Sequence, residues 1–105
     1  MDPAYLLELA GDDRALVREI MGDFLKADAE DRQRLAAAVA ARDATGVHRY
    51  AHRIKGAAQA IGAVEYAALA QVIEDAAATG APQTGDLDAL ERMAIDLVSW
   101  QTSIA

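Results

Sequence analysis

Apolar residues recur at spacings of three and four along almost the whole chain, and no segment alternates apolar and polar residues as a β-strand does. The clearest case is the C-terminal segment, where the recurring residues are Leu87, Leu90, Met93 (or Ala94), Leu97, Trp100 and Ile104. This spacing places apolar side chains on one face of a helix, which must be buried against another element. The pattern therefore predicts an all-α fold.

Residues that cap or stop helices divide this pattern into one short helix and four longer ones. We expect a short N-terminal helix ending at Gly11, a long helix from Asp12 or Asp13 to about Arg42, a helix at about 44–61 capped by Asp43 or Thr45, a helix over 64–78, and a last helix opened by Asp86. Gly62 and the Gly80–Pro82 pair act as stop signals. The polar stretch 26–34 of the long helix is expected to project beyond the core or to bend. Four amphipathic helices with short connections pack most simply as an antiparallel four-helix bundle, here with the short N-terminal helix added.

Length, composition and charge exclude several classes of protein. The 105 residues predict a single domain over 1–105, and the lack of cysteine excludes disulfides and thiolate metal sites. There is no apolar run of about 18–20 residues and no signal-peptide pattern, so we expect a cytoplasmic protein without direct membrane insertion. A net charge of −7 argues against binding to nucleic acid.

One segment of this acidic chain carries basic residues and no acidic ones. Residues 44–64 contain no aspartate or glutamate. The same segment carries His48, Arg49, His52, Arg53 and Lys55. We expect an electropositive surface that attracts an acidic partner or a phosphoryl group, although such charges would also suit an ordinary solvated helix face.

One polar stripe of this helix combines residues that suit phosphoryl transfer. It contains His48, His52, Lys55 and Gln59. Gly56 stands one turn after His52, where a glycine in a helix interior costs about 1 kcal/mol relative to alanine. A neutral imidazole is a usable nucleophile, and Lys55 can neutralise phosphoryl oxygens three residues further on. Gly56 removes a side chain that would crowd the ring. Because the chain has no glycine-rich phosphate loop and no serine or cysteine nucleophile arrangement, we expect no autonomous kinase activity.

The run Ala51-His52-Arg53-Ile54-Lys55-Gly56-Ala57-Ala58-Gln59-Ala60-Ile61-Gly62-Ala63 resembles the signature of histidine-containing phosphotransfer (Hpt) domains. The histidine, the lysine and both glycines agree with that pattern. The resemblance extends over most of the chain, since 69–74 looks like the helix that follows in the family and Asp43 stands where an acidic residue commonly precedes the histidine helix. Ala57 and Ala58 depart from it, because many members have a serine there. This departure is expected to alter the lifetime of the phosphohistidine without abolishing transfer.

The resemblance implies an intermediate of a phosphorelay in two-component signalling. His52 would accept a phosphoryl group from an aspartate of one receiver domain and transfer it to another, Lys55 would stabilise it, Gly56 would give access, and Glu74 would hydrogen-bond the imidazole. The chain would need no cofactor of its own, since the receiver supplies magnesium. The expected partners are response-regulator receiver domains, and a hybrid sensor histidine kinase if the domain belongs to one. We expect a monomer, with His48, Arg49, Arg53 and Gln59 on the docking face.

Two alternatives remain open at this stage. The chain could be a degenerate module that binds a receiver without chemistry, although the intact His52, Lys55 and Gly56 argue against this. His48 and His52 lie one turn apart and could both bind zinc, but no third ligand is predicted nearby, so we assign no metal site. Leu9, Leu16 and Met21 are candidates for an apolar part of the docking surface.

Overall fold

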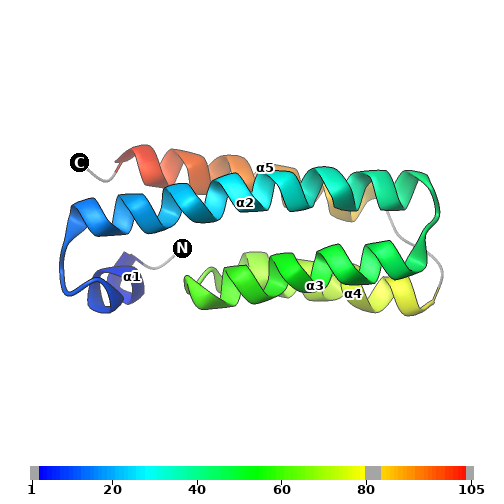
Figure 1. Ribbon diagram of the computed structural model, residues 1–105, viewed down its shortest axis with the longest axis horizontal. Helices are drawn as coiled ribbons and strands as arrows, with labels where there is room; N and C mark the ends of the chain where they lie inside the picture. The colour runs from blue at the N-terminus through cyan, green and yellow to red at the C-terminus, as the bar shows by residue number, and fades with distance from the viewer. Residues whose placement is uncertain (1–2, 80–83, 104–105) are drawn as a thin grey trace.

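The computed structural model describes residues 3–79 and 84–103, and it contains five α-helices in this part of the chain. They are α1 (Pro3–Leu9), α2 (Arg14–Ala40), α3 (Ala44–Ala60), α4 (Val64–Ala78) and α5 (Thr84–Ser103). The four longer helices run antiparallel in chain order, and α1 lies across one end of the rod, whose extents are 43 × 18 × 17 Å (Figure 1). The described residues contain no strand. The predicted all-α four-helix bundle with an additional N-terminal helix is confirmed.

The helix ends follow from side chains close to them in sequence. Asp13 caps α2 by accepting hydrogen bonds from the backbone N–H groups of Ala15 (3.0 Å) and Leu16 (3.2 Å). Asp43 caps α3 by accepting one from Gly46 (3.1 Å). Of the expected alternatives, Asp13 and not Asp12 caps α2, and Asp43 and not Thr45 caps α3. A connection of three residues, 41–43, separates α2 from α3, the helix that carries His52.

The last helix differs slightly from the expectation. α5 begins at Thr84, two residues before Asp86, which lies within its first turn. An aspartate in the first turn is favourable because it lies near the positive end of the helix dipole. The Gly80–Pro82 signal and Ile104 lie outside the described residues.

The core is built largely from small and aliphatic side chains. Its fully buried members of larger volume include Leu6, Met21, Leu35, Ile54, Tyr66 and Leu90. The closest packing is between α3 and α4, whose facing surfaces carry buried alanines such as Ala51 and Ala70. Small side chains let two helix backbones approach closely. The closely packed pair α3–α4 therefore supports the polar groups on its outer face.

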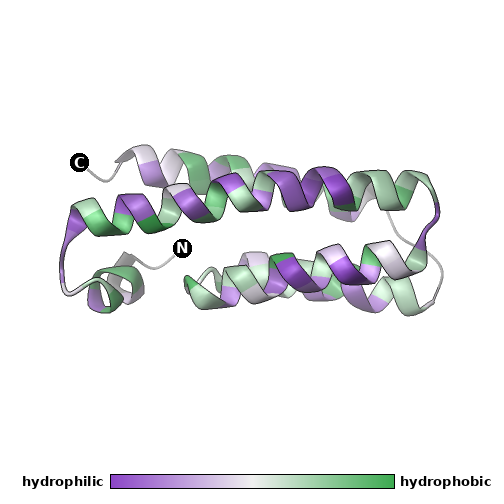
Figure 2. Cartoon of the chain, in the orientation of Figure 1, coloured by the Kyte–Doolittle hydropathy of each residue, from purple (hydrophilic) through white to green (hydrophobic). Residues whose placement is uncertain are grey.

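The polar stretch 26–34 of α2 neither projects nor bends, so this expectation was wrong. Figure 2 shows hydrophilic residues along the middle of a continuous α2. Asp28 is 2% exposed, and its Oδ2 accepts hydrogen bonds of 2.7 Å from the Tyr66 hydroxyl and from Arg32 Nε. Arg32 also reaches Glu91 on α5 (2.6 Å). Burial raises the pKa of the Asp28 carboxyl, although the hydrogen bonds from Tyr66 and Arg32 act in the opposite direction.

The turn between α3 and α4 fixes the relative position of these two helices. Gly62 has φ +76°, and its N–H donates to Gln59 while the N–H of Ala63 donates to Ala58, which forms a Schellman cap. A Cβ at Gly62 would lie 2.5 Å from Cδ1 of Tyr5 on α1. Glycine is required here both for its backbone conformation and for the close approach of α1.

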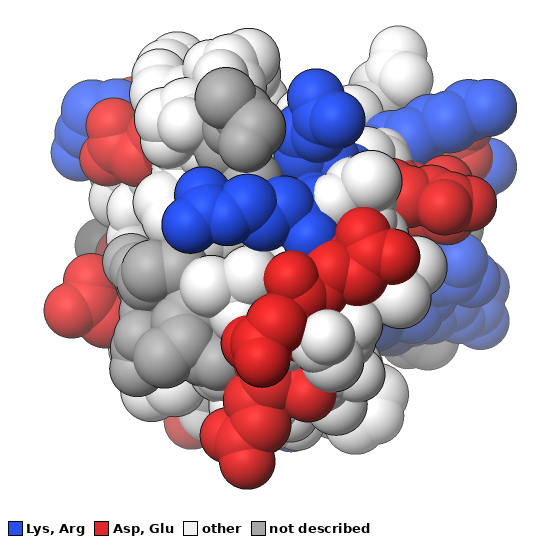
Figure 3. Space-filling view, turned by 90° about the vertical axis from the view of Figure 1, so that its left-hand side faces the viewer, with Lys and Arg blue, Asp and Glu red and all other residues white. Residues whose placement is uncertain are grey.

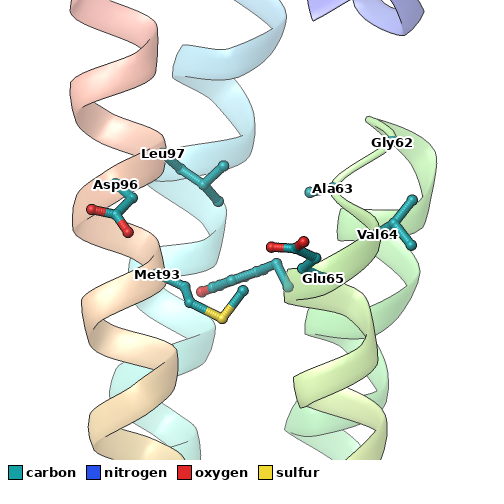
Figure 4. Close-up of a pocket in the computed structure, with 8 residues that line it drawn as sticks. Gly62, Ala63, Val64, Glu65, Met93, Asp96 and Leu97 are labelled. Carbon is teal, nitrogen blue, oxygen red and sulfur yellow. The ribbon is translucent and has the colours of Figure 1, made fainter. Parts of the chain in front are cut away.

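A groove separates the beginning of α4 from the middle of α5 (Figure 4). It has a volume of about 330 Å³ and is lined by Gly62, Ala63, Val64, Glu65, Tyr66, Met93, Asp96 and Leu97. None of the candidate site residues lines this groove. No helix among the described residues combines the length and the apolarity needed to cross a membrane.

Candidate functional site

His52 and Glu74 meet on the outer face of the α3–α4 pair. Nδ1 of His52 lies 2.6 Å from Oε1 of Glu74, a short hydrogen bond between neighbouring helices. The side chain of His52 is 63% exposed, whereas that of Glu74 is only 7% exposed. A buried acceptor therefore holds one nitrogen of an imidazole that is otherwise open to solvent.

The ionisation of Glu74 determines which nitrogen of His52 carries the proton. Desolvation by burial raises the pKa of Glu74, but hydrogen bonds from Lys55 and His52 outweigh it and place the pKa below its ordinary value. Glu74 is therefore a carboxylate at neutral pH and can only accept hydrogen bonds. Nδ1 of a neutral His52 must then be the protonated nitrogen, and Nε2 carries the free lone pair.

Lys55 lies in the same cluster but is not free. Its Nζ donates to Oε2 of Glu74 (2.7 Å) and to Oε1 of Gln71 (2.9 Å), and its side chain is only 16% exposed. The amide of Gln71 in turn donates to Oδ1 of Asp75 (2.8 Å). The structure thus brings together three of the expected site residues, His52, Lys55 and Glu74, and adds two others from α4.

His48 lies one turn before His52 and stacks beside it. The two rings are nearly parallel, at 4°, and their centroids lie 6.1 Å apart. Nε2 of His48 lies 3.7 Å from Oε1 of Glu74, which is the oxygen that accepts from His52. Both histidines therefore face one carboxylate. No group of three or more His, Cys, Asp or Glu side chains in residues 3–79 and 84–103 is arranged to hold a metal ion.

Gly56 is exposed, and the space beside it is open. A Cβ added at this position would meet no atom within 4 Å, including those of the His52 ring. The expectation that a side chain here would crowd the ring is thus wrong for a methyl group, because His52 is bound to Glu74. The packing of the chain itself does not require the glycine.

The electropositive surface is partly neutralised by acids that approach from other helices. Lys55 is paired with Glu74, and Nε of Arg53 lies 3.3 Å from Oδ1 of Asp31 on α2. Arg49 and Gln59 are exposed. Figure 3 shows a similar mixture at the end of the bundle that carries α1, where a band of acidic side chains lies next to basic ones. Charge patterns along one helix cannot include such partners.

Two of the three apolar docking candidates are available at the surface. Leu9 is 59% exposed and Leu16 is 39% exposed. Met21 is completely buried in the core and cannot contact a partner. It follows Val17 by four residues on the inward face of α2.

Sequence reasoning missed Gln71 and Asp75. Gln71 precedes Glu74 by three residues and therefore shares its helix face, which is the signal that could have identified it. Asp75 lies four residues after Gln71, within reach of its amide. Glutamine and aspartate are common on helix surfaces, so neither residue stands out until Lys55 of α3 is placed beside Gln71.

Two comparisons with known proteins gave a match. The family model of the Hpt domain matches residues 19–100. The crystal structure of histidine-containing phosphotransfer protein B (HptB) from Pseudomonas aeruginosa PAO1 superposes with a TM-score of 0.88 at 24% sequence identity, and the match covers 97% of this chain and 90% of that one. A search of curated proteins found no match. The chain therefore belongs to the Hpt-domain family, whose members are phosphocarrier modules of two-component signalling and interact with response-regulator receiver domains.

Proposed function

We propose that this Hpt domain is a phosphorelay intermediate, in which Nε2 of His52 accepts a phosphoryl group from a receiver aspartate and passes it to the aspartate of another receiver. The observation that carries the proposal is the 2.6 Å hydrogen bond between Nδ1 of His52 and Glu74. It assigns the proton to Nδ1, and it leaves a nucleophilic nitrogen on a side chain that is 63% exposed.

No proton has to move when the phosphoryl group is transferred. The Nε2 lone pair attacks the phosphorus of the aspartyl phosphate, the P–O bond breaks, and its electron pair stays with the receiver carboxylate. The imidazole keeps its Nδ1 proton and becomes positively charged, and the Glu74 carboxylate stabilises this charge, as the carboxylate of a catalytic triad does for its imidazolium. In the onward step a second carboxylate attacks phosphorus, and the P–N electron pair returns to Nε2.

Lys55 and Gly56 have supporting roles in this proposal. Lys55 supplies a positive charge that stabilises the phosphorylated state of His52, and Gly56 leaves room for the receiver that delivers the group. The receiver contributes the magnesium ion and its acidic ligands, so this chain needs no cofactor of its own. Catalysis then depends mainly on positioning and electrostatics, as is usual for phosphoryl transfer.

The receiver would dock over the exposed residues around His52. His48, Arg49, Arg53 and Gln59 are the candidates there. The exposed Leu9, at the end of α1, and Leu16, near the beginning of α2, are candidates for an apolar part of the docking surface. Of the two arginines, Arg53 already contacts Asp31. We therefore expect Arg49 to contribute more to electrostatic attraction of an acidic receiver surface.

The direct test is labelling by phosphorylated receivers. A cognate receiver that carries an aspartyl phosphate should label this protein with an acid-labile, alkali-stable phosphate, and His52→Gln should abolish the label. Phosphotransfer profiling against a full set of receiver domains would identify the cognate ones. Persistent labelling of the His52→Gln variant would overturn the assignment. Receiver binding without any label would instead favour a module that docks without chemistry.

A further inference from the structure

The polar side chains at the site form one continuous chain of hydrogen bonds. Asp75 accepts from Gln71, Gln71 accepts from Lys55, Lys55 donates to Glu74, and Glu74 accepts from His52, with distances of 2.8, 2.9, 2.7 and 2.6 Å. The bond to Asp75 fixes the orientation of the Gln71 amide, since its NH₂ group faces Asp75 and its oxygen faces Lys55. Every member has a defined donor or acceptor role.

This arrangement turns Lys55 toward α4 in the unphosphorylated protein. Two of its three ammonium hydrogens are engaged by Gln71 and Glu74, and little of the side chain is exposed. A phosphoryl group on Nε2 would lie on the ring edge away from Glu74. The two acceptors on α4 restrain the Lys55 ammonium and oppose its reorientation toward that group.

We propose that Gln71, held by Asp75, is a positioning residue that retains the Lys55 ammonium at Glu74 and thereby limits its pairing with phosphorylated His52. This inference rests on the proposed role of His52. It assigns to α4 a means of setting the lifetime of the phosphohistidine. Gln71 and Asp75, which have the positioning role, lie outside the His-Lys-Gly run.

The sign of the effect follows from the chemistry of P–N cleavage. Phosphoryl loss passes through a loose transition state, to which the negative charge of the phosphoryl oxygens contributes by expelling the leaving group. An ammonium paired with those oxygens reduces this contribution and slows cleavage. Removal of Gln71 should free Lys55 for the phosphoryl group, so the phosphohistidine should live longer.

The experiment uses phosphoramidate, a small P–N donor that needs only an accessible imidazole. The purified chain is phosphorylated, the donor is removed, and loss of the His52 phosphoryl signal is followed by ³¹P NMR. Gln71→Ala should lengthen the half-life about fivefold, the factor that corresponds to one hydrogen bond of about 1 kcal/mol. Lys55→Ala should shorten it, and Gln71→Ala should have no further effect in the Lys55→Ala background.

Asp75 offers a matched pair of controls. Asp75→Asn keeps a carbonyl oxygen for the Gln71 amide and should behave as wild type, whereas Asp75→Ala should lengthen the half-life in the same direction as Gln71→Ala. A Gln71→Ala half-life equal to that of wild type, or an effect that persists without Lys55, would overturn the inference. Because phosphoramidate replaces the receiver, failure of receivers to label His52 would contradict the proposed relay but not this result.

Discussion

Gly56→Ala should separate the stability of the domain from its function, because it should increase the first and reduce the second. Gly56 lies in the interior of α3, is exposed, and an added Cβ meets no atom within 4 Å. Only helix propensity then changes, and alanine is favoured over glycine by about 1 kcal/mol at such a position. For a domain of this size the melting temperature should rise by about 4 °C.

Phosphoryl transfer from a receiver should fall in the same variant. The chain does not need the open space beside Gly56 for its own packing, so we attribute that space to the approach of the partner. A displacement of about 1 Å from reactive geometry can cost a hundredfold in rate, and we expect at least a tenfold decrease in transfer. Labelling by phosphoramidate should be unchanged, since this donor is too small to meet the new methyl group.

The assay combines thermal unfolding with transfer kinetics from a phosphorylated cognate receiver. Ala57→Gly is the matched control for helix propensity, because Ala57 is the next residue of α3 and is also exposed. Its free energy of unfolding should be about 1 kcal/mol lower than that of wild type. A Gly56→Ala variant that is less stable than wild type would refute the structural argument. A variant that is more stable and still receives phosphoryl groups at the wild-type rate would refute the attribution of the space to the partner.

Three further outcomes are expected. The pKa of Glu74 is lower in the folded state than its ordinary value of 4.5, so its contribution to stability is present above that pH and is lost as the pH falls through the folded pKa. The difference in free energy of unfolding between wild type and Glu74→Gln, measured with urea, should therefore shrink on acidification. A difference that does not depend on pH would contradict the lowered pKa. Tyr66→Phe should lower the free energy of unfolding by about 1.5–3 kcal/mol in the same assay, since it removes a hydrogen bond to buried Asp28 and keeps the ring. The rate of association with a receiver should fall as the salt concentration rises, because exposed charges are screened beyond about 8 Å at physiological ionic strength. The rate should fall less steeply for Arg49→Ala than for wild type. A rate that does not depend on salt would indicate that docking is mainly apolar.

The fold could be predicted largely from local signals. α4 was expected over 64–78 and spans Val64–Ala78, because an apolar period of three to four residues ends at defined stops. Asp13, Asp43 and Gly62 act on backbone groups within a few residues of themselves, so their roles are also encoded locally. The bundle follows because each amphipathic face must be buried.

The polar contacts between helices could not be predicted in this way. Asp28 looks like a solvated helix residue until Tyr66, 38 positions later, is placed against it. Lys55 looks like a free cation until Gln71 and Glu74 approach from α4. Glu74 was selected only through the resemblance to a family, since nothing in the sequence of its own helix distinguishes it from acidic residues that are exposed. Partners of this kind depend on how the helices pack.

The most direct test of the account is the position of phosphorus on the imidazole of His52. Long-range ¹H–¹⁵N spectra of the unphosphorylated protein should show the tautomer with the proton on Nδ1. After phosphorylation by a cognate receiver, ³¹P coupling should place the phosphoryl group on Nε2 of His52. Phosphorus on Nδ1 of His52, or on His48, would contradict the role of the Glu74 hydrogen bond on which the mechanism rests.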